Sequence, residues 1–151
     1  MAVKWNKIYR GGVQRTTPET REVVYTGPVS VILPGAAVAL DADNGVTGEI
    51  GAADFFYLVG EQLHGSVDDN QVGSGSSLRL YTPRSGDLYA GRAAAGLVIV
   101  DDLPLTINDQ GQFAQAGEDD PVFAYVDNPA SAHPGTETPT VADQLIPIKI
   151  K

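Results

Sequence analysis

The chain has 151 residues, a net charge of −9, 17 glycines, 10 prolines and no cysteine. The lack of cysteine excludes disulfides, thiolate nucleophiles and cysteine-ligated metal sites. Glycine and proline recur too often for ordinary helices, which average about 11–12 residues, yet 42% of the residues are hydrophobic, enough for a packed core. These features predict a single compact all-β domain, either a barrel or a sandwich.

The first 21 residues are basic although the chain as a whole is acidic. They contain Lys4, Lys7, Arg10, Arg15 and Arg21 against Glu19 alone. We expect residues 1–21 to form an extended arm and residues 22–151 to form the β-domain. Nucleic acid is disfavoured as the main partner, because its binding needs a basic face on the folded domain. Trp5, Ile8, Tyr9 and Val13 lie among the cations and favour a protein partner with an acidic groove, since interfaces are enriched in aromatic residues and arginine.

The elements expected along the chain are short strands separated by turns. Thr17–Thr20 predicts one helical turn near the end of the arm, and Thr140–Asp143 predicts another before the last strand. The continuous apolar run at residues 93–100 predicts the central strand. Long loops are expected at residues 64–77 and 127–139. The predicted strands are 23–33 (bent at Gly27-Pro28), 36–40, 55–59, 78–82, 93–100, 105–107, 112–115, 122–126 and 144–151.

Two of these strands have a readable alternation. In residues 78–82 two leucines and a threonine share one face, while arginine and tyrosine share the other. In the last strand Ile146, Ile148 and Ile150 share one face, so we expect this strand to pack on its own domain and to close the barrel. Pro147 lacks an N–H group and predicts that the strand lies at a sheet edge.

Residues 33–59 and 89–126 follow a similar order of features. Each stretch has a glycine (Gly35, Gly91), an apolar strand, an Asn/Gly corner, a Gly-x-x-Asp turn and an aromatic strand. A duplication and a convergent hairpin pattern explain this likeness equally well.

The histidines, the acidic residues and the glycine-rich loop show no catalytic or metal-binding pattern. His64 and His133 are isolated in loops, and the calcium-like start at residues 41–45 has Ala52 where that loop needs a bidentate glutamate. Residues 73–77 lack the lysine of a phosphate loop. The acidic pairs are interpreted as solvated turns, because adjacent strand residues point to opposite faces; they are Asp68-Asp69, Asp101-Asp102 and Glu118-Asp119-Asp120. We therefore expect no enzyme, no metal and no cofactor.

The sequence also bears on membranes and export. No apolar run approaches the ~18 residues of a membrane span, and the N-terminus lacks the apolar core of a signal peptide. We therefore expect synthesis in the cytoplasm and no membrane partner.

Over residues 29–126 the chain resembles the capsid decoration proteins (cement or head-stabilising proteins) of tailed bacteriophages. The resemblance rests on the basic N-terminal segment and on the pattern of small residue-Gly-x-Ala, Asp/Asn-Gly corner, Gly-x-x-Asp and aromatic strand. It implies a β-tulip-like domain on the outer surface of the virion, commonly a homotrimer, that stabilises the shell by bridging subunits of the major capsid protein. The implied capsid-binding residues of the arm are Lys4, Trp5, Lys7, Ile8, Tyr9, Arg10, Val13 and Arg15.

Two alternatives from other classes stay open. One is a carbohydrate- or receptor-binding β-module on a virion or cell surface, which is disfavoured because the chain's one tryptophan lies in the arm. The other is an enzyme of β-barrel type, which would need carboxylates from distant turns to converge.

Overall fold

The computed structural model describes residues 8–11, 19–24, 33–40, 46–47, 55–60, 77–127 and 139–151. These residues form short strands and no helix, so the all-β prediction is confirmed. The strands are β1 (Tyr9–Gly11), β2 (Thr20–Val24), β3 (Ala37–Leu40), β4 (Val46–Thr47), β5 (Tyr57–Val59), β6 (Ser77–Tyr81), β7 (Leu88–Ala93), β8 (Pro104–Ile107), β9 (Phe113–Gln115), β10 (Ala124–Val126) and β11 (Gln144–Ile150).

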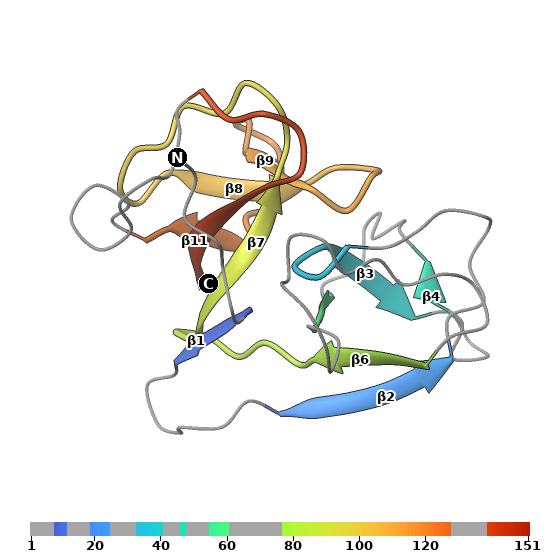
Figure 1. Cartoon of the computed structure of the whole chain (residues 1–151). Coiled ribbons are helices and arrows are strands. Elements are labelled where there is room, and N and C mark those ends of the chain that lie inside the picture. Colours follow the sequence, from blue (N-terminus) through green and yellow to red (C-terminus); the bar gives the residue numbers. More distant parts are fainter. Residues whose placement is uncertain are drawn as a thin grey trace, which may run out of the picture.

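Six strands form the first sheet, in the order β1-β7-β11-β10-β8-β9. β9 also pairs with β7 in parallel, at Ala93 and Phe113, whereas the pairs β7–β11, β11–β10, β10–β8 and β8–β9 are antiparallel. The extra pairing closes a ring of β7, β11, β10, β8 and β9. The ring leaves β1 as an additional strand on β7 (Figure 1).

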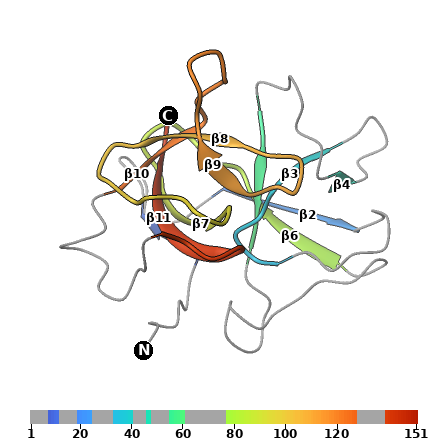
Figure 2. The ribbon, with the colours of Figure 1, turned by 90° about the horizontal axis from the view of Figure 1, so that it is seen from above.

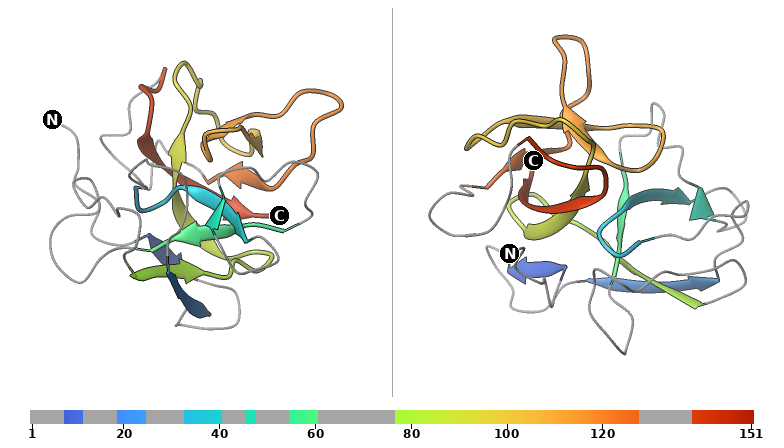
Figure 3. Two further views of the ribbon diagram at one scale, coloured as in Figure 1. Left: turned by 90° about the vertical axis from the view of Figure 1, so that its right-hand side faces the viewer. Right: turned by 45° about the horizontal axis from the view of Figure 1, so that its top comes forward.

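Five strands form the second sheet, in the order β2-β6-β5-β3-β4. The segments predicted as strands on either side of the first corner pair directly, with Ala37 opposite Leu58. Figure 2 shows the ring strands on one side of the molecule and β2, β3, β4 and β6 on the other. β1 and β2 follow one another in the chain but belong to different sheets (Figure 3).

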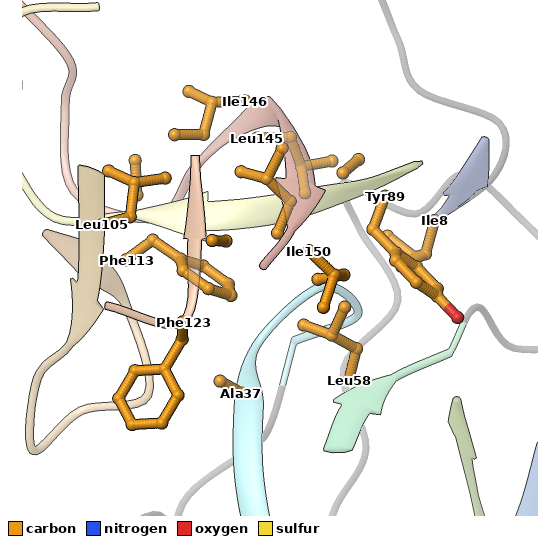
Figure 4. Close-up of a cluster of buried hydrophobic side chains, with 14 of the residues drawn as sticks. Ile8, Ala37, Leu58, Tyr89, Leu105, Phe113, Phe123, Leu145, Ile146 and Ile150 are labelled. Atoms are coloured by element: carbon orange, nitrogen blue, oxygen red, sulfur yellow. The ribbon is translucent and has the colours of Figure 1, made fainter. Parts of the chain in front are cut away.

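The main hydrophobic core joins the two sheets. Ile146, Ile148 and Ile150 are all buried in it, together with Ala37 and Leu58 of the second sheet (Figure 4). Burial of a side chain of this size contributes roughly 1.5–3 kcal/mol. The prediction that the last strand packs on its own domain and closes the barrel is therefore confirmed.

The prediction that Pro147 places this strand at a sheet edge is wrong, because β11 lies between β7 and β10. Lys151 donates its backbone N–H to Phe123 (3.1 Å), so the alternate position 147 also faces β10. β10 ends at Val126, and Asp127 still donates to the carbonyl of Pro147 (3.1 Å). The missing N–H thus faces Asp127, which lies just beyond the end of β10.

The prediction that residues 93–100 form one central strand is also wrong. β7 ends at Ala93, and the chain turns at Gly96, whose φ of 81° suits glycine. Thr140, which is buried, donates its hydroxyl to the carbonyl of Ala94 (2.5 Å) and accepts from the N–H of Leu97 (3.0 Å). These contacts use backbone groups that a continued strand would have offered to a neighbour.

The second predicted helical turn does not form, and residues 17–18 of the first lie outside the described part of the chain. Thr20, expected at the end of the first turn, begins β2. At the second site Gln144 donates to the carbonyl of Val141 (3.2 Å), and Asp143 has a φ of 64°. This geometry is a tight turn into β11, and Thr140 bonds to residues 94 and 97 and does not cap a helix.

The glycines aligned by the internal likeness have different roles. Gly35 lies in a turn with a φ of 90°, whereas Gly91 lies inside β7, where an added Cβ would come within 2.7 Å of the Phe113 ring. The likeness therefore does not extend to equivalent positions in the fold. The first corner and the first Gly-x-x-Asp turn lie outside the described residues.

β6 shows the predicted alternation. Leu78 and Leu80 are fully buried in a second hydrophobic cluster with Val38 and Val59. Tyr81, on the opposite face, belongs to the main core. Both faces of β6 therefore contribute to the interior.

Candidate functional site

The described part of the predicted arm belongs to the folded domain. Ile8 is fully buried and Tyr9 is 9% exposed in the main core, where the Tyr9 ring packs edge-on against Tyr89 (5.2 Å between centroids). Tyr9 pairs with Tyr89 through β1, and Arg21 pairs with Leu80 through β2. These described residues of the expected arm thus contribute to both sheets.

Arg10, a second expected capsid contact, is held inside the same structure. Its guanidinium forms an ion pair with the carboxylate of Asp127 (3.1 Å) and donates a longer hydrogen bond to the carbonyl of Tyr89 (3.4 Å). Burial lowers the pKa of Arg10, while the hydrogen bond and charge of Asp127 act in the opposite direction. Arg10 thus ties β1 to the end of β10 and is not positioned as part of a separate arm.

The other expected arm contacts are Lys4, Trp5, Lys7, Val13 and Arg15, and these residues lie outside the described part of the chain. Their assignment as capsid-binding residues stays a prediction. Most of the two predicted loops, at 64–77 and 127–139, also lies outside it, as do His64 and His133.

A pocket of about 440 Å³ opens between the two sheets and is named here the inter-sheet pocket. Three phenylalanines dominate its walls. Phe56 packs edge-on against Phe123 (5.6 Å between centroids), and both are nearly buried, whereas Phe55 is 47% exposed. The lining residues are Phe55, Phe56, Pro83, Ser85, Pro121, Val122, Phe123, Ile150 and Lys151. The pocket therefore offers an apolar floor, one half-exposed ring and a lysine.

A second apolar surface consists of Val98, Val100 and Val141 and is named here the valine ridge. Their exposed fractions are 58%, 50% and 62%. Leu97 and Ile99 alternate with the first two valines and are buried, so the valines share the outward face. Thr140 donates its N–H to the carbonyl of Leu97 (3.0 Å), which ties the segment of Val141 to the segment that carries Val98.

The two surfaces account for all the large hydrophobic side chains that are exposed in the described residues. Val141 of the ridge and Ile150 of the pocket lie toward opposite ends of β11. Ile150 ends that strand and lines the pocket, whereas Val141 precedes the strand and belongs to the ridge. Seven residues of strand span roughly 20 Å, so Val141 is well separated from Ile150 along the strand.

The acidic turns in the described residues have structural contacts. Asp120 accepts a hydrogen bond from the N–H of Gly117 (2.8 Å) in the predicted turn. Asp102 lies 3.8 Å from the ammonium of Lys149. Within the described ranges no three His, Cys, Asp or Glu side chains gather as metal ligands. The calcium-like segment at 41–45 and the pair at 68–69 lie outside these ranges.

Comparisons with known proteins identify no relative of this chain: no family model matches it, and no curated protein matches its sequence. In the part of the chain that the structure describes, no helix is long and apolar enough to cross a membrane.

Sequence reasoning missed both apolar surfaces. The Phe55-Phe56 pair was a signal for the pocket, since adjacent residues of the expected strand point to opposite faces and the two rings then have different surroundings. Val98 and Val100 were hidden inside an apolar run that predicted a buried strand. The chain leaves the strand at the turn of Gly96, and Thr140 bonds to the segment that follows. The apolar run shows neither feature.

Proposed function

We propose that the protein is a non-enzymatic virion component that binds the outer surface of a mature phage capsid and bridges neighbouring subunits of the major capsid protein. The observation that carries this proposal is the presence of two exposed apolar surfaces, the inter-sheet pocket and the valine ridge. A protein with one contact surface can coat a shell, but a bridge needs two.

The chemistry of the two surfaces suits protein contacts. Protein interfaces have an apolar centre within a polar rim and are enriched in aromatic residues. The inter-sheet pocket places Phe55 beside Ser85 and Lys151, and the valine ridge is followed directly by Asp101 and Asp102, both exposed. Each contact would be small, and many copies on a symmetric shell multiply the effect.

The proposal also covers location and assembly. The protein would be made in the host cytoplasm and would add to the outside of the capsid, as a homotrimer by the resemblance. Lys4, Trp5, Lys7, Val13 and Arg15 remain predicted capsid contacts. Ile8, Tyr9 and Arg10 act through the fold, because β1 holds them in the domain.

The test is co-sedimentation with empty, expanded capsids, using full-length protein. The wild type should co-sediment to saturation. A variant altered at both surfaces, Phe55→Ser with Val98→Ser, should fold normally but bind at least ~10-fold more weakly, since every 1.4 kcal/mol is tenfold. Asp109→Ser, on the exposed turn between β8 and β9, is the control and should bind as the wild type does. Wild-type protein that stays in the supernatant at all concentrations would exclude the capsid role.

The inter-sheet pocket favours a second candidate function, that of a carbohydrate- or receptor-binding module. The sequence argument against it was that the one tryptophan lies in the arm, and Phe55 supplies a half-exposed aromatic ring at a pocket. Calorimetric titration with a panel of oligosaccharides tests this function. Saturable binding that is lost in Phe55→Ser and kept in Val98→Ser would favour it over the capsid role.

A further inference from the structure

We propose that the inter-sheet pocket binds a small aromatic carboxylate, a ligand with one apolar ring and one anionic group. The proposal concerns the protein by itself and does not depend on the capsid role. It differs from the carbohydrate-binding candidate because it requires an anion in addition to a ring.

The first reason is the size and composition of the pocket. Its volume of about 440 Å³ lies in the range of small-molecule sites, which are lined mostly by apolar and aromatic side chains with a few polar groups. Phenylalanine, proline, valine and isoleucine form its walls, and its polar lining residues are Ser85 and Lys151. A site of this composition suits an apolar ligand that carries one polar group.

The second reason is that neighbouring rings hold the aromatic walls in place. Phe55, which is 47% exposed, packs edge-on against Tyr57 (5.1 Å between centroids). Phe56 packs edge-on against both Phe113 (6.0 Å) and Phe123 (5.6 Å). Aromatic pairs gain energy beyond the area that they bury, and walls that are already ordered lose little entropy when a ligand binds. These walls therefore favour a ligand with an aromatic ring.

The third reason is the charge of Lys151. This lysine is exposed and forms no ion pair within the described residues. By contrast, Lys149, two positions earlier, lies 3.8 Å from Asp102. The backbone N–H of Lys151 donates to the carbonyl of Phe123 (3.1 Å), which fixes the residue at the pocket. Its ammonium is thus available for a charge-assisted hydrogen bond to a carboxylate.

The other charged groups next to the pocket have partners. Asp120 precedes a lining residue and accepts a hydrogen bond from the N–H of Gly117 (2.8 Å). Arg84 lies between two lining residues and pairs with Glu19. No aspartate or glutamate is among the described residues that line the pocket. A bound anion therefore meets the ammonium of Lys151 without an opposing carboxylate on the pocket wall.

The experiment is a titration of the full-length, isotope-labelled protein, followed by NMR. The probe is 3-phenylpropionate, and 3-phenylpropan-1-ol is its neutral counterpart. The acid should shift the backbone signals of the lining residues and saturate with a Kd in the low millimolar range, as expected for a ligand of this size. It should bind about 3- to 5-fold more tightly than the alcohol, which is the effect of an ion pair with an exposed lysine. Hexanoate, which has the charge and no ring, should bind more weakly than the aromatic acid.

Two lysine variants separate the charge of the pocket from the charge of the strand. Lys151→Gln should bind the acid and the alcohol equally, whereas Lys149→Gln, the matched control, should keep the preference for the acid. Phe55→Ser should weaken both ligands. Lys151 is exposed, so its variant keeps the test valid even if Phe55→Ser fails to fold.

Four results would overturn the proposal. The first is a titration with the acid that does not saturate by ~20 mM, beyond the affinity expected for its size. The second is equal affinity of the wild type for the acid and the alcohol. The third is a preference for the acid that survives in Lys151→Gln. The fourth is hexanoate binding as tight as that of the aromatic acid.

Discussion

Arg10 and Asp127, 117 positions apart in the sequence, meet in an ion pair of 3.1 Å that joins β1 to the end of β10. Both side chains are mostly buried, with exposed fractions of 14% and 25%. The pair explains why Arg10 belongs to the domain although the sequence around it is basic and rich in glycine.

Replacing Arg10 with alanine should destabilise the protein by about 1–3 kcal/mol, because it leaves a partly buried carboxylate without its cation. Chemical denaturation of Arg10→Ala, Asp127→Ala and the double variant gives the coupling energy between the two side chains. The matched control is the pair Arg84–Glu19, whose side chains are 55% and 43% exposed and whose coupling should stay at ~0–1 kcal/mol. Equal coupling in the two pairs would contradict the structural role of Arg10.

Removing residues 1–11 should cost far more stability than removing residues 1–7. The longer deletion takes Ile8 and Tyr9 out of the main core, and full burial of one such apolar side chain contributes roughly 1.5–3 kcal/mol. Thermal unfolding should show a difference of several degrees, since ~1 kcal/mol shifts Tm by ~2–8 °C in domains of this size. Two deletions with the same Tm would show that β1 contributes nothing to the domain.

Ile148→Ala should lower the free energy of unfolding by about 2–5 kcal/mol, because Ile148 is fully buried inside the ring. Val98→Ala, on the exposed ridge, should change it by less than ~0.5 kcal/mol. Urea titration compares the two. A small effect at Ile148 would mean that β11 does not close the ring.

Gly91→Ala should destabilise the protein by about 1–3 kcal/mol through overpacking. Its Cβ would lie 2.7 Å from the ring of Phe113, the residue through which β9 pairs with Ala93 of β7. A second change, Phe113→Leu, frees space at that contact, so Gly91→Ala should cost less in its presence than in its absence. Additive effects in the double variant would place the strain elsewhere.

Much of the strand pattern could be predicted because local alternation and turn residues were informative. The hairpin of β8 and β9 turns where expected, since Asn108 accepts hydrogen bonds from Gln110 and Gln112 and Gly111 has a φ of 75°. The isoleucine face of β11 likewise indicated burial correctly.

The remaining features depend on contacts between distant segments. Pro147 has no N–H to donate, but the sequence does not show whether a neighbouring strand lies on both sides of it. The burial of Ile8 depends on β7. The inter-sheet pocket takes its walls from four segments, at 55–56, 83–85, 121–123 and 150–151, and no single stretch of sequence shows that they converge.

The central claim is that the protein bridges subunits through two surfaces, and the thermal stability of decorated capsids tests it most directly. Capsids saturated with wild-type protein should disrupt at a higher temperature than bare capsids. Capsids saturated with Phe55→Ser alone or with Val98→Ser alone should disrupt at the temperature of bare capsids, since a protein held by one surface adds mass without joining neighbours. If either single variant protects the shell as well as the wild type does, the two-surface account is wrong.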